Sequence, residues 1–209
     1  MKPLMDTTFE KMEMGKFLEG FNLIRVATFL DGHCYFHAIA KAYFKPYIMG
    51  KVGDQVFDRQ EFVKNLRRDL SIALGNKVNP QNPKSKTFYQ TLANGELEEI
   101  SKAMPEYSLE NMQKELNSNT PVSNYFNEFI SNQLDVDIYI LDARKKDVYM
   151  TGSDLKLLYK GRKSIVILYL PGHYELVGLM ENSTVIETCF SPTHPLISSI
   201  RSRIENKLD

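Results

Sequence analysis

The sequence predicts a single domain of the α/β type (α+β or mixed α/β), because the two parts of the chain carry different patterns of apolar residues. Before Asp137, apolar residues recur at helical spacing, whereas after it they form short runs typical of strands. A chain in which helices precede a group of strands is typical of helices packed against one sheet. The length of 209 residues is enough for one well-buried core.

The composition argues against several classes of function. Lys and Arg together number 26, as do Asp and Glu, so we expect neither nucleic acid nor an anionic membrane as a partner. The longest apolar run, 165–171, is too short to span a bilayer, and residues 1–6 turn polar too early for a secretory signal peptide. The chain has only two cysteines, Cys34 and Cys189, which favours a reducing compartment such as the cytoplasm. The sequence has no C-x-x-C spacing, and His33 and His37, although spaced H-x-x-x-H, supply at most three ligands with Cys34, so no metal site is expected.

Two helices are expected in the first part of the chain. Residues 6–20 have a loosely amphipathic pattern that predicts a helix, and the apolar stretch 23–29 leads to a turn at Asp31-Gly32. A second helix is predicted from Cys34 to about Pro46, because apolar residues follow the cysteine at helical spacing and proline stops the helix.

Further helices are predicted as far as residue 130. Residues 45–57 are interpreted as a loop, and Asp58 with Glu61 resembles a capping box for a helix that ends at Gly75. The apolar face of this helix is predicted at Phe62, Leu66, Leu70 and Ala73. A polar linker at 79–83, short helices at 96–104 and 108–117, and a helix opened by Thr120-Pro121 complete the helical part. The Glu-rich stretch 94–118 is interpreted as a solvated helical surface.

The rest of the chain is predicted to form strands and one closing helix. Residues 138–141 form a buried strand candidate, 147–150 a weaker one, and 165–170 are apolar throughout, as in a central strand. Pro171-Gly172 forms a turn into the alternating strand 173–177, and another strand is expected at 184–190. A closing amphipathic helix contains Leu196, Ile197, Ile200 and Ile204.

Cys34 is the candidate nucleophile. A glycine turn delivers it to the first turn of a helix, where partial positive charge favours the thiolate. Backbone N–H groups without intrahelical partners at that position can stabilise an oxyanion. The alternative is a buried core cysteine, but a polar Asp-Gly turn is rarely placed in a packed core.

His173 is the best candidate base among the four histidines. His33 and His37 are too close to Cys34 in sequence to face its side chain, and they supply at most three metal ligands with it. His194 precedes Pro195 and is expected to be exposed. His173 begins a strand 139 residues after Cys34, a spacing similar to that of papain-like enzymes. Glu175 points to the same side of the strand and is expected to accept the Nδ1–H of the ring.

Two motifs together resemble those of the ovarian tumour (OTU) family of cysteine proteases. Residues 31–38, Asp-Gly-His-Cys-Tyr-Phe-His-Ala, resemble the D-G-x-C-[LFY]-[FY]-x-A signature, and residues 173–177, His-Tyr-Glu-Leu-Val, resemble the family's C-terminal histidine motif. The resemblance implies a papain-like OTU fold, with a central, mostly antiparallel or mixed sheet packed between helical subdomains. It also implies one domain over residues 1–209, with a core at about 22–190.

The resemblance implies a deubiquitinase that hydrolyses the isopeptide bond after the C-terminal Gly-Gly of ubiquitin. Cys34 would be the nucleophile and His173 the general base, and N–H groups of the loop before Cys34 would form the oxyanion hole. Asp31 belongs to the family's first motif, and we expect it mainly to shape the loop. Glu175 stands where the family usually has Asp or Asn and is the expected orienter of His173. The resemblance further implies a monomer that binds ubiquitin or polyubiquitin and needs no cofactor. It implies a cytoplasmic location, which is the cytoplasm of the host cell if the source is viral or bacterial.

Two alternative functions remain open. The first is another papain-like thiol hydrolase, acting on a ubiquitin-like modifier or a different amide through the same Cys34 and His173. The second is a ubiquitin-binding module with weak or lapsed catalysis, which the replacement at Glu175 would allow. The Glu-rich stretch 94–118 is a candidate acidic contact for ubiquitin's basic tail.

Overall fold

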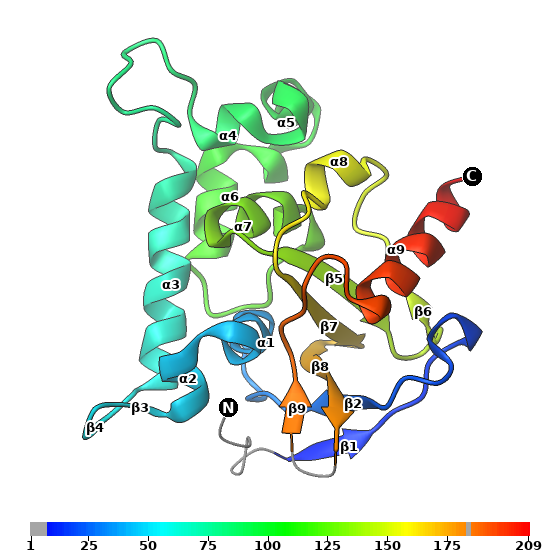
Figure 1. Ribbon diagram of the computed structural model, residues 1–209. Coiled ribbons are helices and arrows are strands. Elements are labelled where there is room, and N and C mark those ends of the chain that lie inside the picture. Colours follow the sequence, from blue (N-terminus) through cyan, green and yellow to red (C-terminus); the bar gives the residue numbers. More distant parts are fainter. Residues whose placement is uncertain (1–7, 183–184) are drawn as a thin grey trace.

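The computed structural model describes residues 8–182 and 185–209. Its centre is a seven-stranded sheet in the order β1-β2-β8-β7-β5-β6, with β9 paired to β8 (Figure 1). β5 and β7 are parallel and the other pairs are antiparallel, so the sheet is mixed, as predicted. The strands are β1 Phe9–Lys11, β2 Leu23–Val26, β5 Asp137–Asp142, β6 Asp147–Val148, β7 Ser164–Leu170, β8 His173–Glu181 and β9 Val185–Glu187.

Helices cover both faces of the sheet. The described α-helices are α1 Cys34–Tyr43, α2 Lys45–Met49, α3 Arg59–Leu74, α4 Phe88–Thr91, α5 Leu97–Ala103, α6 Leu109–Leu116, α7 Asn127–Leu134, α8 Leu155–Leu158 and α9 Pro195–Leu208. In Figure 1, α3 to α7 lie on one side of the sheet and α9 on the other. None of the described helices combines the length and the apolar character needed to cross a membrane.

Alternation along the strands creates two hydrophobic cores. On β5, Ile138 and Ile140 join the core under α1, α3, α6 and α7, while Tyr139 and Leu141 join the core under α9. All four residues predicted for the closing helix are buried in that second core. A strand whose neighbouring side chains point to opposite faces can serve two cores only when both faces are covered. This explains why residues 138–141 of β5 and 165–170 of β7 are apolar without a break.

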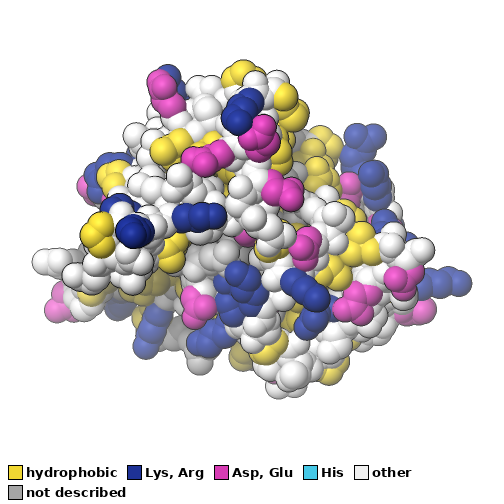
Figure 2. All heavy atoms as spheres, turned by 90° about the horizontal axis from the view of Figure 1, so that it is seen from above, with side chains coloured by type: hydrophobic (Ala, Val, Ile, Leu, Met, Phe, Trp, Pro, Cys, Tyr) yellow, Lys and Arg dark blue, Asp and Glu magenta, His cyan; other side chains and the backbone are white. Residues whose placement is uncertain are grey.

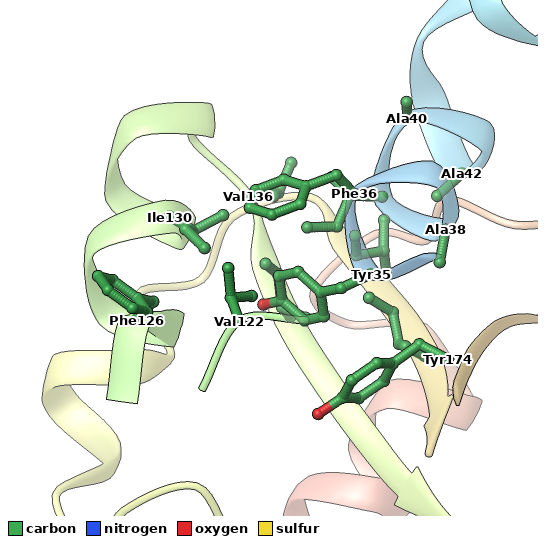
Figure 3. Packing of buried hydrophobic residues seen from close by; sticks show 14 of the residues in the cluster. Tyr35, Phe36, Ala38, Ala40, Ala42, Val122, Phe126, Ile130, Val136 and Tyr174 are labelled. Carbon is green, nitrogen blue, oxygen red and sulfur yellow. The ribbon is translucent and has the colours of Figure 1, made fainter. Parts of the chain in front are cut away.

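α1 is buried on almost every side and carries the cysteine into the larger core. Figure 3 shows Tyr35 and Phe36 pointing from α1 toward residues of α7 and its flanks, with Tyr174 of β8 beside Tyr35. The rings of Tyr35 and Tyr174 are 5.3 Å apart in an edge-to-face arrangement. Their hydroxyl groups donate to Asn127 and Asn124. The start of α1 is therefore fixed against β8 by both apolar and polar contacts.

Several predicted elements agree with the structure. The Asp58 side chain accepts the N–H of Glu61 at 2.9 Å and caps α3, which ends at Gly75. Gly172 has a φ of +74°, as required at the third position of a type II turn after proline. The turn connects the end of β7 to the start of β8, so the two strands form a tight hairpin. The linker at 79–83 is also confirmed, and the short helices predicted at 96–104 and 108–117 are α5 and α6.

The prediction of a helix at 6–20 is wrong. Among the described residues of that stretch, Phe9–Lys11 forms strand β1 and Lys16–Leu18 a single 3₁₀ turn. β1 pairs antiparallel with β2, with Phe9 opposite Val26. Gly15 and Gly20 weaken any helix there, and the unpaired edge of β2 provides backbone hydrogen bonds for a strand.

Three boundaries and one helix face also differ from expectation. Residues 45–57 contain α2 and the hairpin of β3 (Lys51–Val52) and β4 (Gln55–Val56), because Gly50 and Gly53 adopt the left-handed conformation. The helix after Pro121 begins only at residues 124–127, and strand β9 is shorter than 184–190, whose Thr184 lies outside the described residues. The buried face of α3 is Val63, Arg67, Leu70, Ser71 and Leu74, so three of the four predicted positions are shifted by one residue.

Candidate active site

The loop before Cys34 is held by the side chain of Asp31. Oδ1 of Asp31 accepts the backbone N–H of His33 at 2.8 Å, and its Oδ2 lies 3.1 Å from Nε2 of His37. His33 is the N-cap residue of α1, so Cys34 is the first residue of the helix. Asp31 therefore links the loop before Cys34 to the first turns of α1.

Both histidines close to Cys34 in sequence are committed to other partners. Nδ1 of His33 lies 2.9 Å from a guanidinium nitrogen of Arg67, and because a guanidinium only donates, this Nδ1 is an acceptor. His37 uses Nδ1 with the hydroxyl of Tyr47 and Nε2 with the loop carboxylate. Burial lowers the pKa of both rings, so both are neutral at pH 7. Neither ring has a nitrogen free to serve the thiol.

The thiol of Cys34 is buried, with only 1% of the residue exposed. Burial raises the pKa of Cys34, and this effect exceeds the opposite effect of the backbone N–H groups of Tyr174, Tyr35 and Cys34 itself. The helix terminus was expected to favour the thiolate, but removal of the sulfur from water outweighs it. The hydrogen bond from Tyr174 also places the sulfur beside the residue that follows His173.

The ring of His173 has acceptors on one side. Its Nε2 lies 3.5 Å from Oγ1 of Thr28 and 3.7 Å from Oε1 of Glu175. Oγ1 of Thr28 donates its own proton to the carbonyl of Tyr174 at 2.6 Å, so toward the ring it can only accept. Two acceptors at Nε2 favour the tautomer with the proton on Nε2, which leaves Nδ1 as the basic nitrogen. Glu175 was expected to accept from Nδ1, and the structure places it on the Nε2 side instead.

Glu175 is held by an arginine that the sequence did not reveal. Arg25 of β2 donates from Nε to Oε2 of Glu175 at 2.7 Å and from Nη2 to Oε1 at 3.1 Å. β2 and β8 are antiparallel neighbours, which brings the two side chains together from positions 150 residues apart. The structure thus collects Cys34, His173, Glu175 and Arg25 where α1, β8 and β2 meet.

The comparisons with known proteins concern the fold. No family model matches the sequence, and no curated protein matches it either. A solved structure described as an ovarian tumour (OTU) domain in complex with ubiquitin matches with a TM-score of 0.53 and 17% identity, over 95% of this chain and 91% of that chain. The chain has the OTU fold. The OTU domain protease of Taggert virus and the ubiquitin-bound OTU of Hazara virus also match, with 16% and 15% identity and TM-scores of 0.42 and 0.40, over 85% and 86% of this chain and 96% and 86% of theirs.

Arg67 is a further residue of this OTU fold that sequence reasoning missed. It is 1% exposed and donates to Gly32 O, to Leu116 O and to Glu115 O at 2.8–2.9 Å, besides its contact with Nδ1 of His33. Burial lowers its pKa to about 10, so it remains charged. The only sequence signal is an arginine inside the apolar stripe of α3. Arg67 ties the loop before Cys34 to the end of α6.

Gly32 allows the same two segments of the OTU fold to touch. A Cβ on this residue would lie 1.7 Å from the carbonyl oxygen of Asn119 and 3.1 Å from Cα of Thr120. The side chain of Asn119 hydrogen-bonds His33 as well. Glycine is therefore needed at this position because a side chain would collide with a neighbouring backbone. This reason adds to the turn that the sequence indicated.

The two remaining candidates lie away from this site. His194 is half-buried and caps α9, with its Nδ1 accepting the N–H of Leu196 at 3.1 Å. One ring nitrogen of His194 and carboxylate oxygens of Glu181 and Glu187 lie within 4.8 Å of one another, and Nε2 is 3.8 Å from Glu187, a grouping that the sequence spacing did not indicate. Because Nδ1 of the neutral ring accepts a hydrogen bond, Nε2 carries the proton and has no lone pair for a metal. Cys189 is a half-buried free thiol.

Proposed function

We propose that this protein is a cysteine deubiquitinase, which hydrolyses the isopeptide bond after the C-terminal Gly-Gly of ubiquitin. The observation that carries the proposal is the arrangement at His173, whose Nε2 faces two acceptors and whose Nδ1 is left as a base. The fold supports it, because the matched OTU domain was solved in complex with ubiquitin. The proposed enzyme works as a monomer in the cytoplasm and needs no cofactor, since its nucleophile and base are protein side chains.

The proposed reaction proceeds in two halves. His173 accepts the thiol proton, and the Cys34 thiolate attacks the carbonyl carbon of the terminal glycine. The carbon–nitrogen bond then breaks, and His173 returns the proton to the leaving lysine amine. In the second half, water attacks the thioester and gives a proton to His173, the carbon–sulfur bond breaks, and the sulfur regains its proton.

The oxyanion would be stabilised by the backbone of the loop before α1. The N–H of His33 is already bound to Asp31, whereas the N–H of Cys34 lies beside its own sulfur. The N–H of Cys34 is therefore the donor best placed for an oxyanion formed at the sulfur. Residues 115–120 support this loop through Arg67 and Gly32 and keep the donor in place.

The two acidic residues have different proposed roles. Glu175 orients the ring of His173, and Asp31 holds the loop. Glu175→Ala should therefore lower turnover clearly, whereas Asp31→Ala should weaken loop integrity. If Glu175→Ala turned over substrate like the wild type while Asp31→Ala were inactive, the orienting role would pass to Asp31.

Charge on the surface fits a protein partner of mixed composition. Figure 2 shows acidic and basic side chains interspersed over the face seen from above, with apolar side chains between them. The exposed glutamates of the 94–118 stretch lie on α5 and α6 and beside them, and Glu99 and Glu110 pair with neighbouring lysines. The remaining exposed carboxylates of this stretch are the proposed contact for the basic tail of ubiquitin.

The experiment that tests the proposal is covalent capture. The protein is incubated with ubiquitin carrying an electrophile at its C-terminus, and the adduct is detected as a mass increase that Cys34→Ala abolishes. Absence of an adduct with ubiquitin and with every ubiquitin-like modifier tested would refute the proposal. An adduct without cleavage of ubiquitin chains would instead support a binding module with lapsed catalysis, a reading that the raised pKa of Cys34 makes worth testing.

A further inference from the structure

Glu175 shares its carboxylate between two partners. Arg25 donates to both oxygens of Glu175, at 2.7 and 3.1 Å, and Oε1 also faces Nε2 of His173 at 3.7 Å. The Glu175 side chain is 8% exposed and that of Arg25 is 35% exposed, so the pair lies at the border between core and solvent. The two contacts form a chain from Arg25 through Glu175 to His173.

A glutamate needs outside help to orient a histidine. Its side chain has several rotatable bonds, and its carboxylate rotates freely about the last of them. A two-pronged bond from a guanidinium fixes both the position and the plane of a carboxylate, which a single donor does not do. Arg25 thereby directs Oε1 toward Nε2 of His173.

The charged groups around this chain come from three elements. β2 supplies Arg25, and α1 supplies Lys41 and the thiol of Cys34. Glu10 of β1 acts on Arg25 from the outer side. Lys41 donates to the carbonyl of Ala27 at 2.6 Å and makes no bond to Glu175, so Arg25 is the cation that contacts this carboxylate.

We propose that Arg25 is a positioning residue of the active site, which sets the orientation of His173 by clamping Glu175. This inference rests on the proposed thiol chemistry of Cys34 and His173. Arg25 itself touches neither the sulfur nor the ring. Its removal frees the carboxylate to rotate away, and the base then approaches the thiol in fewer productive orientations.

The test compares five variants in a Cys189→Ser background, so that Cys34 is the only thiol. Alkylation of Cys34 by iodoacetamide is followed against pH, and cleavage of a ubiquitin chain is measured in parallel. Arg25→Gln should slow alkylation at pH 7 and lower kcat by on the order of 10-fold, with KM unchanged. Glu175→Gln should do the same, and the double variant should be no slower than Glu175→Gln alone.

Two controls separate positioning from charge and from general stability. Arg25→Lys keeps the cation without the two-pronged bond, so it should remain several-fold slower than the wild type. Arg203→Gln removes an arginine that holds Asp147 by two bonds of 2.9 Å far from the site, and it should alkylate at the wild-type rate. The alkylation rate rises with pH as the Cys34 thiol loses its proton. In Arg25→Gln the midpoint of this rise should lie at higher pH, because a misplaced imidazolium and the loss of a cation both disfavour the thiolate. A role confined to stability would leave that rise in place.

The outcomes distinguish this inference from the proposed function. The role of Arg25 would be overturned if Arg25→Gln matched the wild type in alkylation rate, in pH dependence and in kcat. Full activity in Arg25→Lys would overturn it as well. Additive effects of the Arg25 and Glu175 changes would also overturn it. Failure of the wild type to cleave ubiquitin, with the alkylation pattern as expected, would refute the deubiquitinase proposal and support the clamp.

Discussion

Among the described glycines, Gly32 is the one where an added methyl group would make the shortest contact, and it lies in the loop before Cys34 at the candidate active site. An alanine Cβ would lie 1.7 Å from the carbonyl oxygen of Asn119, whereas ordinary contacts begin at 3.4 Å. Both partners are backbone, so no side chain can rotate out of the way. In Gly32→Ala the loop before α1 and the segment at Asn119 must therefore separate by about 1.7 Å.

The expected consequence is larger for activity than for stability. Overpacking of this kind costs about 1–3 kcal/mol in the free energy of unfolding. A displacement of more than 1 Å at the nucleophile costs on the order of 10²-fold in rate. We therefore expect Gly32→Ala to fold, to lose about 2 kcal/mol in urea unfolding, and to form the ubiquitin adduct about 100-fold more slowly than the wild type.

Gly152→Ala is the matched control. Its added Cβ would meet only a methyl group of Leu158 at 3.6 Å, an ordinary contact. Neither Gly32 nor Gly152 has a positive φ, so the comparison isolates close approach from backbone strain. If Gly32→Ala behaved like Gly152→Ala in both assays, the loop before Cys34 would not depend on its contact with Asn119, and the reasoning would fail.

Two further predictions concern stability. Arg67→Met leaves the carbonyls of Gly32 and Leu116 and Nδ1 of His33 without the donor that Arg67 supplies, so it should cost about 3–5 kcal/mol in urea unfolding; a loss below about 1 kcal/mol would contradict this. Asp147 has its pKa held far below the usual range, first by the bond from Arg203 and then by Lys207. A carboxyl whose pKa is depressed by folding stabilises the protein above its ordinary pKa and loses that contribution as the pH falls. Asp147→Asn should therefore cost about 1 kcal/mol at pH 7, and the difference from the wild type should shrink below about pH 4; a constant difference would exclude the ion pair as its cause.

The fold class and most elements followed from local patterns. Asp58 and Gly75 marked the ends of α3, and Pro171-Gly172 marked the hairpin, because caps and turns depend on residues close in sequence. β1 did not follow, because Phe9–Lys11 becomes a strand only through pairing with β2. The loosely amphipathic pattern of this stretch also occurs in weak helices, and pairing with a neighbouring strand overrides a weak preference for helix.

The sequence by itself determined the parts of the site that are local. The Asp-Gly turn and the helix start predicted where Cys34 lies, and strand alternation predicted that Glu175 shares a side with His173. Only the tertiary structure decided their surroundings. Burial raises the pKa of Cys34, and Arg25 reaches Glu175 from a strand 150 residues away in sequence. Such effects depend on distances in space and on removal from water, which neighbouring residues in the chain do not encode.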